Sequence, residues 1–96
     1  MVSERWLWDQ PPNCAVITDK LVLDDGATIL MVAHDLDDHG WQFLSGAEPV
    51  SVDARIVSLE QIVGLDPSVS KVSDLPLGCR ATRTSATARW QIICRS

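Results

Sequence analysis

The run at residues 28–33 (Thr-Ile-Leu-Met-Val-Ala) constrains the fold of this chain more than any other feature. It is apolar on both faces when read as a strand, so both faces of that strand must be covered. The continuous apolar stretch, residues 29–33, is far shorter than the roughly 20 residues that a membrane-spanning helix needs. We therefore expect a central strand of a sheet, and no association with a membrane.

Shorter β-prone segments surround this strand. A hairpin turn is predicted at Asp25 and Gly26, between the central strand and the run that precedes it. Near the other end of the chain, two runs separated by polar residues predict a second hairpin. The predicted strands other than the central one lie at residues 14–18, 20–24, 41–44, 79–84 and 88–94.

Residues 58–75 carry helix signals instead. Ser58 and Gln61 form a capping-box pattern, in which the serine oxygen accepts the amide proton of Gln61. Gly64 is expected to end this helix. Asp66 and Pro67 predict a second helical turn, because Asp suits the N-cap and Pro suits the first helical position.

These elements predict an α+β fold: an antiparallel sheet of about five to six strands with one or two short helices. The 96 residues suit one domain. The Pro11-Pro12 break divides it into an N-terminal head, residues 1–12, and a body, residues 13–96. Trp6 and Trp8 lie in the head, where we expect them to pack back onto the sheet.

Charge is unevenly distributed along the chain. The net charge is −5, with most acidic residues in the first half and most basic residues near the end. The start of the sequence lacks the apolar core of a signal peptide, so we expect a cytoplasmic protein. The three cysteines, Cys14, Cys79 and Cys94, are then expected to be free, small, buried side chains.

The densest polar cluster is the loop at residues 34–39, His-Asp-Leu-Asp-Asp-His. His34, Asp37 and His39 are candidate metal ligands because imidazole and carboxylate bind zinc, manganese and non-haem iron. Their spacing matches no established ligand motif, and a solvated acidic turn is the alternative. No phosphate-binding loop or nucleophile elbow is present, so we assign no catalytic residue and expect no cofactor. The acidic balance of the chain opposes nucleic-acid binding.

Residues 37–48 (Asp-Asp-His-Gly-Trp-Gln-Phe-Leu-Ser-Gly-Ala-Glu) resemble a bacterial family of unknown function with the motif Asp-Ser-Gly-Trp-x-Phe-x-x-Gly-x-Glu. Residues 65–69 and 75–80 resemble two further stretches of that family in the same order, and the likeness covers about residues 13–90. His39 stands where the family usually has serine. Some members are regarded as immunity proteins of polymorphic toxin systems. The resemblance implies a cytosolic, non-enzymatic protein that binds and blocks a toxin.

Three functional hypotheses follow. The first is a protein-binding module, in which the acidic loop and the nearby tryptophan contact another protein such as a basic toxin domain. The second is a small metal-binding protein or hydrolase that uses the loop at residues 34–39. The third is a structural homodimer, formed by self-association of the acidic region with the basic C-terminal hairpin. The residues expected to contact a partner in the first hypothesis are Asp35, Asp37, Asp38, His39 and Trp41.

Overall fold

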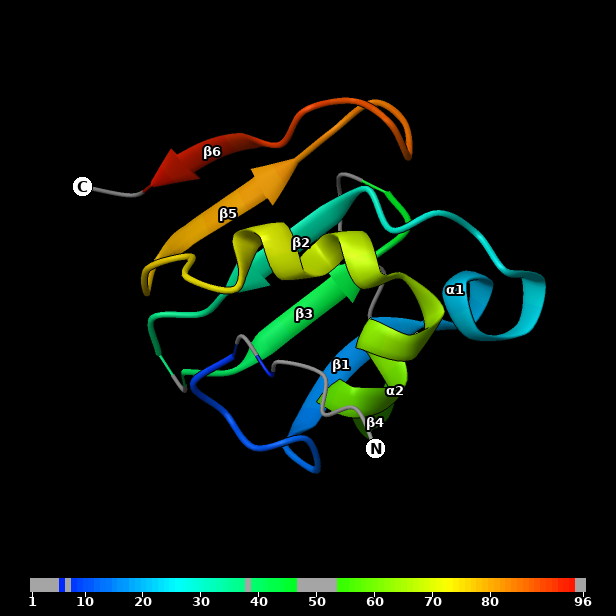
Figure 1. Ribbon diagram of the computed structural model, residues 1–96, viewed down its shortest axis with the longest axis horizontal. Coiled ribbons are helices and arrows are strands. Elements are labelled where there is room, and N and C mark those ends of the chain that lie inside the picture. Colours follow the sequence, from blue (N-terminus) through cyan, green and yellow to red (C-terminus); the bar gives the residue numbers. More distant parts are fainter. Residues whose placement is uncertain (1–5, 7, 38, 47–53, 95–96) are drawn as a thin grey trace.

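The computed structural model describes residues 6, 8–37, 39–46 and 54–94. They form one six-stranded sheet in the order β4-β1-β3-β2-β5-β6. Three short helices accompany it, and two of them, α2 (Leu59–Leu65) and η2 (Pro67–Val72), lie over one face of the sheet (Figure 1). This arrangement confirms the α+β class. The strands are β1 (Ala15–Asp19), β2 (Met31–His34), β3 (Trp41–Leu44), β4 (Ala54–Ser58), β5 (Cys79–Thr82) and β6 (Gln91–Cys94).

The sheet is mixed, whereas the sequence predicted an antiparallel one. β1 and β3 run parallel, and the other four pairings are antiparallel. The parallel pair arises because β3 is inserted between β1 and β2, which are the first two strands along the chain. The predicted C-terminal hairpin is confirmed as β5 and β6.

The hairpin predicted at Asp25 and Gly26 is wrong. Residues expected as a strand form the helix α1 (Lys20–Asp25). Asp19 caps its N-terminus by accepting a hydrogen bond from the Val22 amide at 2.9 Å. Gly26 ends it in the left-handed conformation, with φ 68°. A glycine with positive φ occurs at the end of a helix as readily as in a hairpin turn. The glycine alone therefore could not distinguish the two structures.

The strand β4 (Ala54–Ser58) was not predicted from the sequence. It pairs with β1 at the edge of the sheet, and three of its five residues are exposed. An edge strand with little buried surface shows no clear alternation of apolar and polar residues, so its pattern was not recognised.

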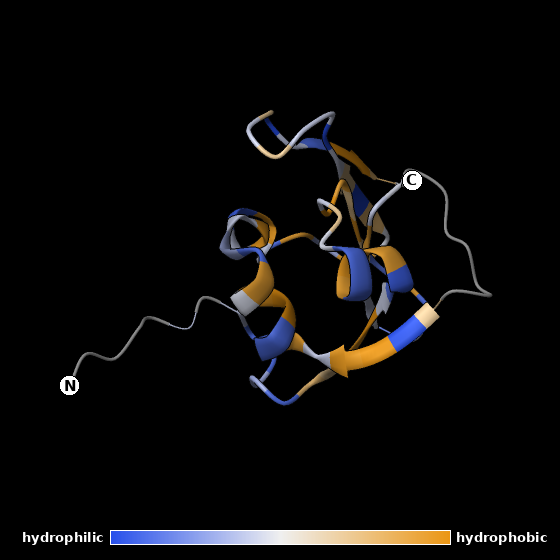
Figure 2. Ribbon diagram, turned by 90° about the vertical axis from the view of Figure 1, so that its right-hand side faces the viewer, coloured by the Kyte–Doolittle hydropathy of each residue, from blue (hydrophilic) through white to orange (hydrophobic). Residues whose placement is uncertain are grey.

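The helices α2 (Leu59–Leu65) and η2 (Pro67–Val72) cover one face of the sheet, which we name the front face. Figure 2 shows both hydrophobic and hydrophilic residues on this helical layer, as expected for helices with one buried side. The predicted cap is confirmed, since the Gln61 amide donates to Ser58 Oγ at 3.1 Å. Gly64 does not end α2. The helix continues to Leu65, and Asp66 both ends it and caps η2.

The core lies between the front face and the helices. Trp41 and Phe43 of β3 are at its centre, with Leu59 and Ile62 of α2 packed in the same cluster. Trp8 from the head joins them, and its ring contacts that of Trp41 edge-on at a centroid distance of 4.9 Å. The head therefore contributes to the core of the body, as predicted for Trp8.

Candidate functional site

The loop at residues 34–39, which we name the acidic loop, lies in the hairpin between β2 and β3. The Asp35 amide donates to the Gly40 carbonyl at 2.8 Å, which closes the loop at its base. His39 has φ 60°, and it is the one non-glycine residue with a positive φ among the described residues. Short polar side chains and His tolerate this conformation better than most residues do. The acidic-turn alternative is therefore consistent with the backbone geometry.

The predicted partner-contact residues have different environments. Asp37 and His39 are exposed, and Asp35 is half-buried. The Asp35 carboxylate accepts a hydrogen bond from Gln42 Nε2 at 2.7 Å, which fixes its direction. Asp38 lies outside the described residues.

Trp41, which was predicted to contact a partner, is buried in the core. Its exposed fraction is 2%, and it packs between Trp8 and the His34 ring, which stacks on it at 4.0 Å. Alternation along β3 places Trp41 on the front face under the helices. Its large apolar surface stabilises the core and is not available to a second protein in this conformation.

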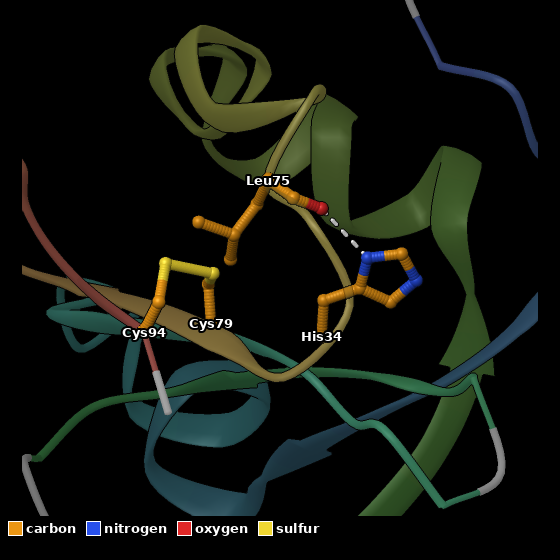
Figure 3. Close-up of a disulfide and its surroundings, with 4 residues drawn as sticks. All are labelled: His34, Leu75, Cys79 and Cys94. Carbon is orange, nitrogen blue, oxygen red and sulfur yellow. Dashed lines mark hydrogen bonds between the residues drawn. A yellow bond between two sulfur atoms is a disulfide. The ribbon is translucent and has the colours of Figure 1, made fainter. Parts of the chain in front are cut away.

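His34, a candidate metal ligand, forms a hydrogen bond with the backbone. Its Nδ1 lies 2.7 Å from the Leu75 carbonyl oxygen and donates to it (Figure 3). This bond leaves the proton on Nδ1, and a lone pair on Nε2 in the neutral ring. In the part of the chain that the structure describes, no group of three His, Cys, Asp or Glu side chains is close enough to hold a metal ion. Within the described ranges, His34, Asp37 and His39 therefore do not come together as such a set.

The sheet face opposite α2 and η2, which we name the back face, carries a row of directly opposed residues across all six strands. The pairing registers connect Ile56 to Ile17, Ile17 to Gln42, Gln42 to Ala33, Ala33 to Arg80 and Arg80 to Ile93. Four of these six residues are apolar, and Ile56 and Ile93 at the two edges are exposed. Ile17 and Ala33 between them are half-buried, and of the four apolar residues only Ala33 and Ile93 line a concave surface on this face.

Such a concave surface lies on the β2, β5 and β6 side of this row. It is a groove of about 500 Å³, which we name the back-face groove. Its apolar lining comes from the sheet and from Leu36 at the tip of the acidic loop. Its polar lining comes from the same loop, from β3 and from β5. The apolar part includes Met31, Ala33, Leu36 and Ile93, and the polar part includes Asp35, Asp37, Gln42 and Arg80.

Leu36 is the most informative residue of the groove. Its side chain is large and apolar, yet its exposed fraction is 60%. Its neighbours in the sequence are two acidic residues, Asp35 and Asp37. Its side chain approaches the Cα of Gly78, because a Cβ placed on Gly78 would lie 3.8 Å from the Leu36 Cβ. Gly78 has φ 82° and its amide donates to the His34 carbonyl at 2.8 Å. Gly78 thus holds the β2–β5 end of the sheet close beneath Leu36.

Arg80 supplies the positive charge of the groove. It is exposed on the back face, and no ion pair or hydrogen bond involves its side chain within the described ranges. Arg83, three residues later, is held in a different environment. Its guanidinium is buried, pairs with Asp66 at 2.8 Å and lies 4.1 Å from the centre of the Trp90 ring. The basic hairpin read from the sequence therefore mixes an exposed cation with a structural one.

Two of the three cysteines are bonded, so the expectation of three free thiols is wrong. Cys79 and Cys94 are directly opposed in the β5–β6 pair and form a disulfide. Cys14 is free and half-buried. The sequence spacing gave no indication of the bond, because only the strand register brings these two residues together.

Sequence reasoning found the acidic loop but missed Leu36, Arg80 and Ile93 as part of the same surface. The exposed Leu36 between two acids was a visible signal. The other two residues were not recognisable, since a groove across several strands depends on their order in the sheet.

Comparison of the chain with protein-family models, with curated proteins and with solved structures gives no match. The resemblance at residues 37–48 therefore stays a prediction. None of the helices in the described part of the chain is long and apolar enough to cross a membrane.

Proposed function

We propose that this protein is a non-enzymatic protein-binding module that contacts its partner through the back-face groove and the acidic loop. The observation that carries the proposal is the exposure of Leu36 at the rim of that groove, between Asp35 and Asp37. Leaving a large aliphatic side chain exposed forfeits about 1.5–3 kcal/mol of burial free energy. A partner that covers Leu36 recovers part of this energy on binding.

The lining defines the chemistry of the partner. Leu36 and Ile93 offer aliphatic contacts, whereas Asp35 and Asp37 attract a Lys or Arg side chain. Arg80 is available to a carbonyl or carboxylate group. The fitting partner is a protein segment that combines aliphatic and basic residues. An inhibitor of the immunity type is the finer form of this proposal, and it rests on the resemblance at residues 37–48.

Selection of peptides from a random phage-displayed library tests the proposal, because it requires only the protein itself and no identified partner. We expect enrichment of peptides that contain Lys or Arg beside aliphatic residues. In the double variant Asp35→Asn/Asp37→Asn, their affinity should fall by about tenfold, equivalent to about 1.4 kcal/mol. The matched control is Asp24→Asn/Asp25→Asn, which removes two exposed charges from α1, outside the groove.

A second variant separates charge from shape. Leu36→Ser should weaken the same peptides without changing their salt dependence, because it removes apolar contact and no charge. The proposal is wrong if no peptide is enriched, or if the loop variants and the α1 control bind the selected peptides equally well.

A further inference from the structure

The Cys79–Cys94 disulfide connects two very different environments. Cys79 is buried and belongs to the core cluster, whereas Cys94 is exposed on the last described strand. Figure 3 shows the Leu75 side chain, itself buried, pointing toward the disulfide from the helical side. The bond thus joins the edge of the sheet to a residue that is fixed in the core.

β6 has few other attachments. Among the described residues it is an edge strand that pairs with β5 alone, and all four of its residues are exposed. Ile92 points to the front face and Ile93 to the back face, each a little more than half exposed. Just before β6, Trp90 packs against the core under the Arg83 guanidinium. The strand is therefore held at one end by Trp90 and at the other by the disulfide.

β6 also forms part of the back-face groove. Ile93 lines it, and so do Cys79 and Arg80 of the adjacent strand. If β6 leaves β5, the groove loses the wall that Ile93 provides, and the outer edge of β5 becomes free. Arg83 and Trp90 fix the connection between β5 and β6, so this movement is confined to the strand beyond Trp90.

We propose that the Cys79–Cys94 disulfide is a redox latch that holds β6 in place and so keeps the back-face groove complete. In the oxidised state β6 is paired and Ile93 walls the groove. In the reduced state β6 separates from β5 beyond Trp90, while Cys79 stays in the core as a thiol. The effect on partner binding rests on the function proposed for the groove, but the release of β6 does not.

A dithiol reductant drives the opening by thiol–disulfide exchange. Its thiolate attacks the sulfur of Cys94, the exposed partner, and forms a mixed disulfide while Cys79 leaves as a thiolate and takes up a proton. The second thiol of the reductant, as a thiolate, then attacks the sulfur through which the same reductant molecule is bonded to Cys94. This step releases Cys94, which takes up a proton. Two electrons and two protons pass to the protein, and the reductant becomes a cyclic or linked disulfide.

Hydrogen exchange measured by mass spectrometry on the full chain tests the latch, with dithiothreitol as the reductant. The experiment uses a Cys14→Ala background, so that the free thiol cannot exchange with the pair. We expect amides in β6 to exchange at least about tenfold faster after reduction and to become the least protected of the sheet, while β1, β2 and β3 stay protected although the whole domain is less stable. Cys94→Ala should show the fast pattern with or without dithiothreitol.

Two results overturn the latch. Exchange in β6 that changes by less than about twofold means that pairing and Trp90 suffice to hold the strand. Loss of protection across the whole sheet means that the bond is a general staple of the fold. Binding of the selected peptides is measured on the same samples: loss on reduction supports control of the groove, and unchanged binding with a released β6 contradicts it. Absence of peptide binding to the oxidised protein rejects the proposed function, and the exchange result still decides the latch.

Discussion

Replacing Arg83 by methionine should destabilise this protein far more than the same replacement of Arg80, the exposed arginine of the same hairpin. Arg83 is a buried cation whose side chain is 2% exposed. Its guanidinium donates to Asp66 Oδ2 at 2.8 Å, to Ser68 Oγ at 2.9 Å and to the Ile29 carbonyl at 3.0 Å. A fourth bond reaches the Ala86 carbonyl at 3.2 Å. One side chain therefore ties the β5–β6 loop to η2 and to the segment that precedes β2.

The magnitude follows from what the substitution leaves behind. Removing one partner of a buried ion pair costs about 3–5 kcal/mol, because the other charge stays uncompensated. The Asp66 side chain is 24% exposed, so water solvates part of its charge and the lower end of that range applies. Methionine retains apolar contact with Trp90. We expect a loss of about 3 kcal/mol in the free energy of unfolding, a large share of the roughly 5–15 kcal/mol typical of a domain.

Urea unfolding followed by far-ultraviolet circular dichroism measures this loss. Arg83→Lys keeps the charge but not the planar fork, so it should lie between Arg83→Met and the wild type. Arg80→Met is the matched control, since Arg80 is exposed on the same hairpin, and its effect should stay within about 0.5 kcal/mol. The reasoning is refuted if the Arg83→Met and Arg80→Met proteins unfold at the same urea concentration.

Three smaller predictions concern single residues elsewhere. Burial raises the pKa of Asp19, but hydrogen bonds from the backbone of Ser45 and Val22 and from the Ser45 hydroxyl outweigh it and hold the pKa below 3.8. The charged form of Asp19 therefore stabilises the fold above pH 3.8, and this contribution is lost as the pH falls through the folded pKa. When the free energy of unfolding is measured as a function of pH, the destabilisation caused by Asp19→Asn should therefore shrink in acid. His39→Gly should raise the free energy of unfolding by about 0.5–1 kcal/mol in urea, because glycine adopts its positive φ without strain; a loss of stability would contradict this. Cys94→Ala should lower the thermal midpoint, with a loss of about 3 kcal/mol expected for a loop of this length, and a midpoint equal to that of the oxidised wild type would count against it.

The candidate site was predictable only where its residues are adjacent in sequence. The loop that carries Asp35, Asp37 and His39 stands out because a short segment made almost wholly of charged and imidazole side chains cannot be buried without partners. Trp41 follows shortly after, yet it points to the other face of the sheet, and sequence proximity alone suggested a shared surface. Arg80 and Ile93 joined the site through strand order, for which the sequence carries no local signal.

Local signals fixed several elements of this fold on their own. The capping oxygen of Ser58 and the Asp66-Pro67 pair start their helices in the structure as the sequence predicts, because a cap acts through neighbouring backbone amides. Alternation within residues 41–44 placed Trp41 and Phe43 on one face for the same reason: side-chain direction along a strand is a local property.

The tertiary structure decided what depends on contacts between distant segments. It made residues 20–25 a helix, since the Asp19 cap is reinforced by hydrogen bonds from the Ser45 amide and hydroxyl at the end of β3. It recruited β4 as an edge strand, made Arg83 a buried ion-pair partner, and placed Cys79 opposite Cys94. Each outcome depends on the register and order of strands, which are set by packing over the whole domain and not by any one segment.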